Sequence, residues 1–275
     1  MQRISGYVDV EGGKLYYEQS GEGHPLVLVH AGIADHRMWD EQFRVFAERF
    51  RVVRYDQRGF GLSRSEAVSF SRREDLRALL QHLGIERAHL LGLSMGGSLV
   101  TDFTLEYPDM VTALIPVAAG LSGHQPAPGT DAKAQYERER ETEMETLWEK
   151  KEIERLKEME LELWVDGPLQ PSDRVPHPLR ERVREMNDLA YTHDGEGFKP
   201  QPLERAAAGR LGEIRVPTLV IVGDLDTTSV LDACRRLAED IPGAREVIIP
   251  GAAHMVNMER PAEFNRIVLD FLATV

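Results

Sequence analysis

The stretch Leu90-Leu91-Gly92-Leu93-Ser94-Met95-Gly96 decides the fold. An apolar run enters the pattern Gly-x-Ser-x-Gly and helical sequence follows it, which predicts a strand, a tight turn and a helix. Glycines on both sides of Ser94 suit a strained strand-to-helix turn, because larger side chains would collide there. The alternative is an ordinary Ser-Gly turn, but the strand before it and the helix after it favour a nucleophile. Ser94 is therefore the candidate nucleophile.

The rest of the chain alternates between short apolar runs and helical periodicity. Strands are predicted at 26–29, 52–53, 218–222 and 247–249. The continuous apolar runs at 26–29 and 52–53 are typical of parallel strands that are buried on both faces. Apolar residues at helical spacing predict helices at 43–50, 76–83, 230–237 and from 261 onward. A hairpin is predicted near the start, around Glu11-Gly12-Gly13. This alternation predicts an α/β fold with a mostly parallel sheet and helices on both faces.

The alternation stops in a long internal segment. The segment is rich in charged residues, yet apolar side chains recur through it at helical spacing, including Trp148 and Trp164. Its charges are interpreted as a solvated surface, and its apolar residues favour amphipathic helices, one of them at 179–191, over a disordered tail. We therefore predict a core of residues 1–120 and 210–275 and an inserted helical cap of residues 121–209.

Composition limits the classes of function that the chain can have. The 275 residues are 42% hydrophobic and 29% charged, which is typical of a globular protein. The net charge of −13 disfavours sequence-independent binding to nucleic acid or to an anionic membrane. The sequence contains no apolar run of transmembrane length and no signal-peptide pattern, so a cytoplasmic protein is expected. Cys234 is the only cysteine, and its place on the apolar face of a helix predicts a core position.

A serine hydroxyl needs a base, and one of the nine histidines is placed to supply it. His254 follows the last predicted strand, so it is expected at the same sheet edge as Ser94. The third member should be a carboxylate that follows a strand between these two in the chain, and Asp224 and Asp226 are the candidates. The other histidines lack partners at metal-ligand spacing, so no metal site is predicted.

The loop His30-Ala31-Gly32, which follows the first predicted parallel strand, can complete the site. A backbone N–H from this loop, together with the N–H of Met95, would stabilise a developing oxyanion. Ala31 and Gly32 are both candidates for that N–H, and Gly32 is preferred. The side chain of His30 is interpreted as organising its own loop by hydrogen bonding.

Together these motifs resemble those of the α/β-hydrolase family. The turn Tyr55-Asp56-Gln57-Arg58-Gly59-Phe60-Gly61-Leu62-Ser63 resembles the family's D-x-R-G-x-G-x-S, and it is interpreted as structural because it matches no phosphate-binding pattern. Three segments follow in the family's order: the turn at residues 92–96 (the elbow), the loop at 223–226 (the acid loop) and the loop at 251–255 (the histidine loop). Ala31 departs from the glycine that is usual in the family. In the family's G-x-x-D pattern the acid is the fourth residue, which implies Asp226 when counted from Gly223. The resemblance covers essentially the whole chain, the inserted segment matching the family's cap in position and helical character.

The resemblance implies a serine hydrolase that cleaves a small carboxylic ester or lactone through an acyl-enzyme. It assigns catalysis to Ser94, Asp226 and His254 and the oxyanion hole to the backbone N–H groups of Gly32 and Met95. The elbow is most similar to those of carboxylesterases, enol-lactone hydrolases and cofactor-free perhydrolases, so no metal or organic cofactor is expected. Perhydrolysis, carbon–carbon bond hydrolysis and a ligand receptor on a hydrolase scaffold are the alternatives. The expected partner is a small-molecule substrate, and a homo-oligomer is compatible with the sequence.

Overall fold

A mostly parallel sheet forms the centre of the protein, whose computed structural model describes residues 3–66, 68–126, 129–193 and 199–275. Over these residues the sheet has nine strands in the order β1-β2-β4-β3-β7-β8-β10-β11, with β5 (Arg64–Ser65) beside β2. The hairpin of β1 (Ile4–Val10) and β2 (Gly13–Ser20) is antiparallel, as predicted, and β2 is antiparallel to β4. The other main strands pair in parallel: β4 (Arg51–Tyr55), β3 (Pro25–Val29), β7 (Ala88–Leu93), β8 (Val111–Val117), β10 (Leu219–Gly223) and β11 (Arg245–Ile249).

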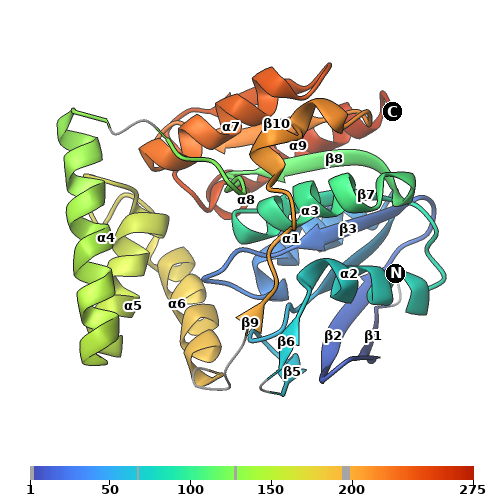
Figure 1. Ribbon diagram of the computed structural model, residues 1–275, viewed down its shortest axis with the longest axis horizontal. Helices are drawn as coiled ribbons and strands as arrows, with labels where there is room; N and C mark the ends of the chain where they lie inside the picture. Colours follow the sequence, from blue (N-terminus) through green and yellow to red (C-terminus); the bar gives the residue numbers. More distant parts are fainter. Residues whose placement is uncertain (1–2, 67, 127–128, 194–198) are drawn as a thin grey trace.

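Helices cover both faces of the sheet, as the alternating pattern predicts (Figure 1). α1 packs against α9, and α2 packs against α3. The core helices are α1 (Asp40–Phe46), α2 (Arg72–His82), α3 (Met95–Glu106), α7 (Thr228–Asp240), α8 (Val256–Glu259) and α9 (Pro261–Leu272). In the described part of the chain, none of the helices combines the length and the apolar character needed to cross a membrane.

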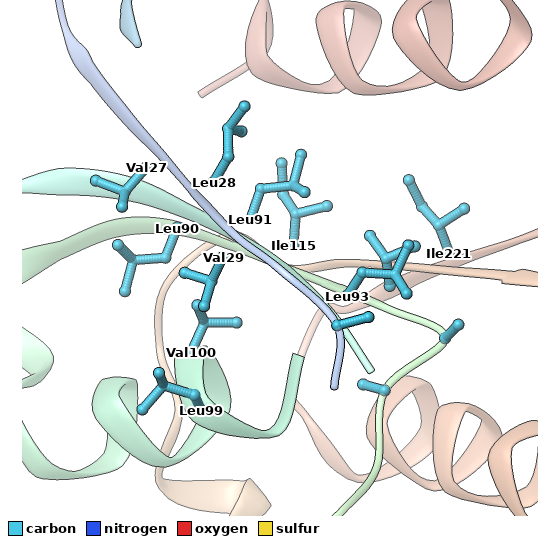
Figure 2. Close-up of a cluster of buried hydrophobic side chains, with 14 of the residues drawn as sticks. Val27, Leu28, Val29, Leu90, Leu91, Leu93, Leu99, Val100, Ile115 and Ile221 are labelled. Carbon is cyan, nitrogen blue, oxygen red and sulfur yellow. The ribbon is translucent and has the colours of Figure 1, made fainter. Parts of the chain in front are cut away.

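The hydrophobic core lies where β3, β7, β8 and β10 run side by side. Figure 2 shows side chains of these strands pointing to both faces, with helices above and below them. Leu28, Leu91 and Ile115 are fully buried there. Burial on both faces explains why these strands are continuous apolar runs in the sequence. Cys234 on α7 is also fully buried, as predicted, and burial raises the pKa of its thiol.

Two core elements differ from the sequence prediction. The sequence analysis predicts no strand at residues 111–117, where the structure has β8. In the structure Pro116 lies in the parallel ladder opposite Gly92. The predicted helix at 43–50 is too long, since α1 ends at Phe46 and the chain turns before β4 begins. Phe50 nevertheless packs against the core.

The inserted segment, residues 121–209, contains the expected helices, which lie to one side of the sheet (Figure 1). They are α4 (Ala132–Lys150), α5 (Ile153–Leu161), the π-helical turn η3 (Glu162–Asp166) and α6 (His177–Thr192). Leu147, Leu156 and Met159 form a small apolar cluster of their own. A short strand that the sequence did not predict, β9 (Lys199–Pro200), pairs with β6 (Ser69–Phe70) and ties the returning chain to the core.

His89, at the start of β7, gives a prediction about pH and stability. Burial and the neighbouring imidazole of His24 lower the pKa of His89 to about 4. Because this is below the unfolded value of about 6.5, the contribution of His89 to stability is complete above pH 6.5 and is lost as the pH falls towards 4. We expect the melting temperature of His89→Gln to decline less than that of wild type over this range.

The control for this measurement is His177→Gln. The His177 side chain is 83% exposed, so this variant should follow the wild-type curve. Parallel curves for His89→Gln and wild type between pH 6.5 and 4 would contradict the expected role of His89.

Candidate active site

Ser94 lies on a strained turn between β7 and α3. Its backbone angles are φ 58° and ψ −114°, in a region that residues other than glycine rarely adopt. A side chain at Gly92 would overlap the carbonyl of Gly96, and a side chain at Gly96 would overlap the carbonyl of Val29. The sequence therefore needs both glycines, as the motif predicts, and the turn holds Ser94 at the carboxyl edge of the sheet.

His254 and Asp226 form a buried pair at the same edge. The distance from His254 Nδ1 to Asp226 Oδ2 is 2.8 Å, and the residues are 3% and 1% exposed. The other carboxylate oxygen, Oδ1, accepts the N–H of Thr227 at 2.7 Å. With Nδ1 as the donor to the carboxylate, Nε2 of His254 is the nitrogen available to act as a base.

The parallel pairing of β10 and β11 explains why these two loops meet. Asp226 follows β10 and His254 follows β11, so both loops leave the sheet at one edge. Gly223 permits the approach, because a side chain there would overlap the carbonyl of Ala252. The N–H of Leu225 donates to that same carbonyl at 3.0 Å.

Ser94 shares this edge, but its hydroxyl makes no hydrogen bond to the residues that the structure describes. The Ser94 N–H donates to the carbonyl of Val117 at 2.9 Å, which anchors the elbow to β8. Hydrogen bonds between a nucleophile and its base are often long until substrate binds. The structure therefore joins two of the three expected residues directly and places the third at the end of a strand in the same sheet.

Asp224 has a different role from the predicted one. Because Asp224 follows the end of the strand directly, the sequence predicts that its carboxylate binds backbone N–H groups of its own turn. Instead its Oδ1 accepts the N–H of Gly251, in the histidine loop, at 2.7 Å. The close approach of the two loops brings this N–H within reach, so Asp224 ties the acid loop to the histidine loop.

The loop after β3 contains both candidates for the oxyanion donor, Ala31 and Gly32, and their contacts distinguish them. The N–H of Ala31 donates to the sulfur of Met38 at 3.3 Å, so it is already engaged. Gly32 lies beside Met95, since a Cβ on Gly32 would stand 3.9 Å from the Met95 side chain. His30 organises the loop, as predicted: its Nε2 accepts the N–H of Gln57 at 2.9 Å, and its Nδ1 lies 2.8 Å from the carbonyl of Ala31. Burial lowers the pKa of His30, which favours the neutral ring.

The π-helical turn of the inserted segment contacts the candidate base. The ring of Trp164 lies 4.7 Å from that of His254, centroid to centroid. Arg174 holds this turn by donating to the carbonyl of Val165 and pairing with Glu259 at 2.6 Å. Glu259 in turn accepts the N–H of Ala253, next to His254. π-Helical turns are frequent at functional sites, and sequence patterns had not indicated this one.

One charged residue of α4 is not part of a solvated surface, which corrects the sequence interpretation. Glu137 is buried, and its carboxylate accepts the N–H of Thr228 at 2.9 and 3.0 Å. Lys133 of the same helix donates to the backbone carbonyl of Asp226. A single glutamate within a charged run gives no signal in the sequence, so this contact with the acid loop could not be predicted.

A cavity of about 240 Å³ lies between the core and the inserted helices. Its core side includes Gly32, the preferred oxyanion donor, and its other side is formed by α4, α5 and α6. The lining residues are Gly32, Arg58, Gly59, Phe60, Arg72, Trp148, Glu160, Asn187, Ala190 and Tyr191. The turn around Arg58 is structural, as predicted, because Arg58 pairs with Asp75, but it also forms part of this wall.

Among the described residues, one group of side chains is close enough to share a metal ion: Asp35, His36 and Asp56. Arg37 donates to both oxygens of Asp35. Asp56 accepts the N–H and lies 2.7 Å from Nδ1 of His36. These contacts already engage both carboxylates, so we interpret the group as a structural hydrogen-bond network.

The fold, the strained serine and the buried histidine–aspartate pair define an α/β hydrolase. A family model described as "Alpha/beta hydrolase family" matches residues 26–267. The chain belongs to this family.

Relatives of the chain have different stated activities. It is 32% identical to a 2-hydroxy-6-oxononadienedioate/2-hydroxy-6-oxononatrienedioate hydrolase of Paraburkholderia phymatum, over 98% of this chain and 95% of the relative. The enol-lactonase of Burkholderia xenovorans LB400 has 27% identity and a TM-score of 0.74, covering 98% of this chain and 100% of that one. A thermophilic esterase from Thermogutta terrifontis has 26% identity and a TM-score of 0.75, covering 100% and 99%.

Proposed function

We propose that the protein is a serine hydrolase that cleaves a small carboxylic ester or lactone through an acyl-enzyme. The observation that carries this proposal is the buried Asp226–His254 pair at the sheet edge where the strained Ser94 lies. Similarity to an enol-lactonase and an esterase supports it.

In the proposed mechanism, Ser94 attacks the acyl carbon while His254 Nε2 takes its proton. Asp226 holds the imidazole in the required tautomer and stabilises the imidazolium that forms. The N–H groups of Gly32 and Met95 stabilise the oxyanion, and the engaged N–H of Ala31 supports the choice of Gly32. The tetrahedral intermediate then collapses to the acyl-enzyme, as the bond to the alcohol oxygen breaks and His254 gives its proton to that oxygen. In the second half of the reaction His254 takes a proton from a water that attacks the acyl carbon, and it returns this proton to Ser94 as the acid is released.

Carbon–carbon bond hydrolysis is the second candidate. The observation that favours it is the 32% identity to a relative named as a hydrolase of 2-hydroxy-6-oxo dienedioates, along almost the whole of both chains. The same serine, histidine and aspartate could serve either reaction, because a fold does not fix the chemistry.

A panel of substrates separates the two candidates. Initial rates would be measured with short-chain 4-nitrophenyl esters, with γ- and δ-lactones and enol lactones, and with vinylogous 1,5-diketones. We expect kcat/KM to be highest for an ester or lactone. Turnover of the diketones at a kcat/KM far above that of every ester and lactone would select the second candidate. Stoichiometric binding without turnover of any class would favour the receptor alternative.

The cavity gives a prediction about acyl-chain length. Trp148 is 49% exposed and lines the cavity from α4. Trp148→Ala should enlarge the cavity and raise kcat/KM for octanoyl relative to butanoyl esters by about tenfold. Because the side chain is half exposed, the melting temperature should change little.

Trp164→Ala is the matched comparison for this prediction. Its ring contacts His254, so its loss should lower kcat/KM for all chain lengths together. We propose that the inserted segment is a cap that covers the cavity and selects substrate. An unchanged chain-length profile in Trp148→Ala would contradict this proposal.

The remaining expectations rest on composition. Three expectations stay predictions: a cytoplasmic location, no nucleic-acid or membrane partner, and a possible homo-oligomer. Cell fractionation would test the location and the membrane partner, and sedimentation of the purified protein, alone and with nucleic acid, would test the other two.

A further inference from the structure

An arginine without a counter-ion lies on the wall of the cavity. Arg72 is the first residue of α2, and its side chain lines both the cavity that reaches Gly32 and a second hollow that reaches Met95. Within the described residues it joins no ion pair and no hydrogen bond, and its Nε is buried without a partner. Since a charged group removed from water without a partner is costly, Arg72 marks a candidate binding site.

The carboxylate that acts on Arg72 is already engaged. Asp75, three residues along α2, accepts hydrogen bonds from Nε and Nη2 of Arg58, each at 2.7 Å. Asp75 and Tyr55 are the titratable groups whose charges act on Arg72. Two guanidinium groups therefore face one carboxylate, and this wall of the cavity keeps one positive charge in excess.

The carboxylate on the opposite wall does not neutralise Arg72. Glu160 of α5 accepts hydrogen bonds from Asn187 at 2.7 Å and from Tyr191 at 3.0 Å. The charged neighbour that acts on Glu160 is Lys157, and burial raises the pKa of Glu160 towards its neutral form. An anion in the cavity would thus meet a free guanidinium on one side and a weakened negative charge on the other.

We propose that Arg72 binds a carboxylate of the substrate. The proposal rests on the proposed function and narrows it to esters, lactones or diketones that carry a second, anionic group. A guanidinium fork matches a carboxylate with two parallel, charge-assisted hydrogen bonds, which gives both strength and geometric specificity. Arg72 lines the hollow that includes Gly32 and the hollow that includes Met95, so one substrate could place a carboxylate on Arg72 and its reacting carbonyl at those two N–H groups.

The test compares two esters with the same six-carbon acyl chain. 4-Nitrophenyl hydrogen adipate ends in a carboxylate, and 4-nitrophenyl hexanoate ends in a methyl group. In wild type we expect a higher kcat/KM for the adipate ester. Arg72→Gln should lower the adipate-to-hexanoate ratio by about 10- to 100-fold, mainly through KM, and Arg72→Lys should restore part of it.

Arg77→Gln on the same helix is the matched control. The Arg77 side chain is 40% exposed and pairs with Glu74, so its loss removes the same formal charge away from the cavity. It should leave the ratio unchanged. The proposal is overturned if Arg72→Gln and wild type have the same ratio, or if Arg77→Gln lowers it as much as Arg72→Gln does.

A binding measurement distinguishes this proposal from the proposed function. Calorimetry would compare monomethyl adipate with methyl hexanoate on Ser94→Ala and on Ser94→Ala combined with Arg72→Gln. We expect Arg72→Gln, added to Ser94→Ala, to weaken the binding of monomethyl adipate at least tenfold more than the binding of methyl hexanoate. If binding is lost selectively but wild type does not turn over any substrate of the panel, the proposed function is wrong and the role of Arg72 stands. If wild type turns over esters but adipate binding is not lost selectively, the role of Arg72 is wrong and the proposed function stands.

Discussion

Ser94→Ala is expected to lower kcat for ester hydrolysis on the order of 10⁶-fold and to leave the protein folded. In the proposed mechanism the hydroxyl forms the bond to the acyl carbon, and the backbone N–H groups of the oxyanion hole cannot replace it. Alanine fits the turn, since the glycines at 92 and 96, not the hydroxyl, give the elbow its space. Steady-state kinetics and circular dichroism would check both parts.

Ser98→Ala is the control for this experiment. Ser98 lies one helical turn further along α3, and its hydroxyl lies 3.4 Å from the Ser94 carbonyl. Its loss should change kcat by no more than a few-fold. If Ser94→Ala keeps activity near that of Ser98→Ala, the protein does not use Ser94 as a nucleophile.

Asp226→Asn is expected to lower kcat by roughly 10⁴-fold. The Asp226 carboxylate accepts from Nδ1 of His254 on one oxygen and from the N–H of Thr227 on the other. In asparagine one of these two oxygens becomes an NH2 group. When the amide oxygen accepts the Thr227 N–H, the NH2 group faces Nδ1 of His254 and favours the wrong imidazole tautomer. The variant should stay folded because its shape is unchanged.

Asp224→Asn is the matched comparison, two residues away in the same loop. Its contact is a single bond from the Gly251 N–H, which a neutral amide oxygen accepts more weakly than a carboxylate does. We expect a loss of stability and nearly normal kcat. The reverse pattern, an inactive Asp224→Asn and a near-normal Asp226→Asn, would transfer the role of the acid to Asp224.

Strong local patterns made most of the fold predictable. The apolar runs of β3, β7 and β10 indicate strands that are buried on both faces. The glycines around Ser94 indicate the geometry of the tight turn. Prediction failed at β8, which pairs with β7 and β10. Pro116 lies in this strand opposite Gly92, although proline cannot donate a backbone hydrogen bond to a ladder, so the local sequence gives no strand signal there.

The candidate site was predictable where a motif sits at the end of a strand. Ser94, Asp226 and His254 follow β7, β10 and β11, and parallel strands bring their ends to one edge. Arg72 was not assigned to the site, and the contact of Trp164 with His254 was not predicted. Both depend on which cavity or ring the side chain faces after the inserted segment packs against the core. Such contacts join residues far apart in the chain and leave no periodic signal.

Labelling with a fluorophosphonate tests the central claim most directly, because this probe reacts with a serine only when a base activates it. Wild-type protein would be labelled, digested and mapped by mass spectrometry. The proposed site predicts one adduct per chain on the peptide that contains Ser94, with loss of ester turnover in proportion to labelling and no adduct in Ser94→Ala. An adduct on another serine while Ser94 stays unmodified, or full ester turnover after complete labelling of Ser94, would contradict it.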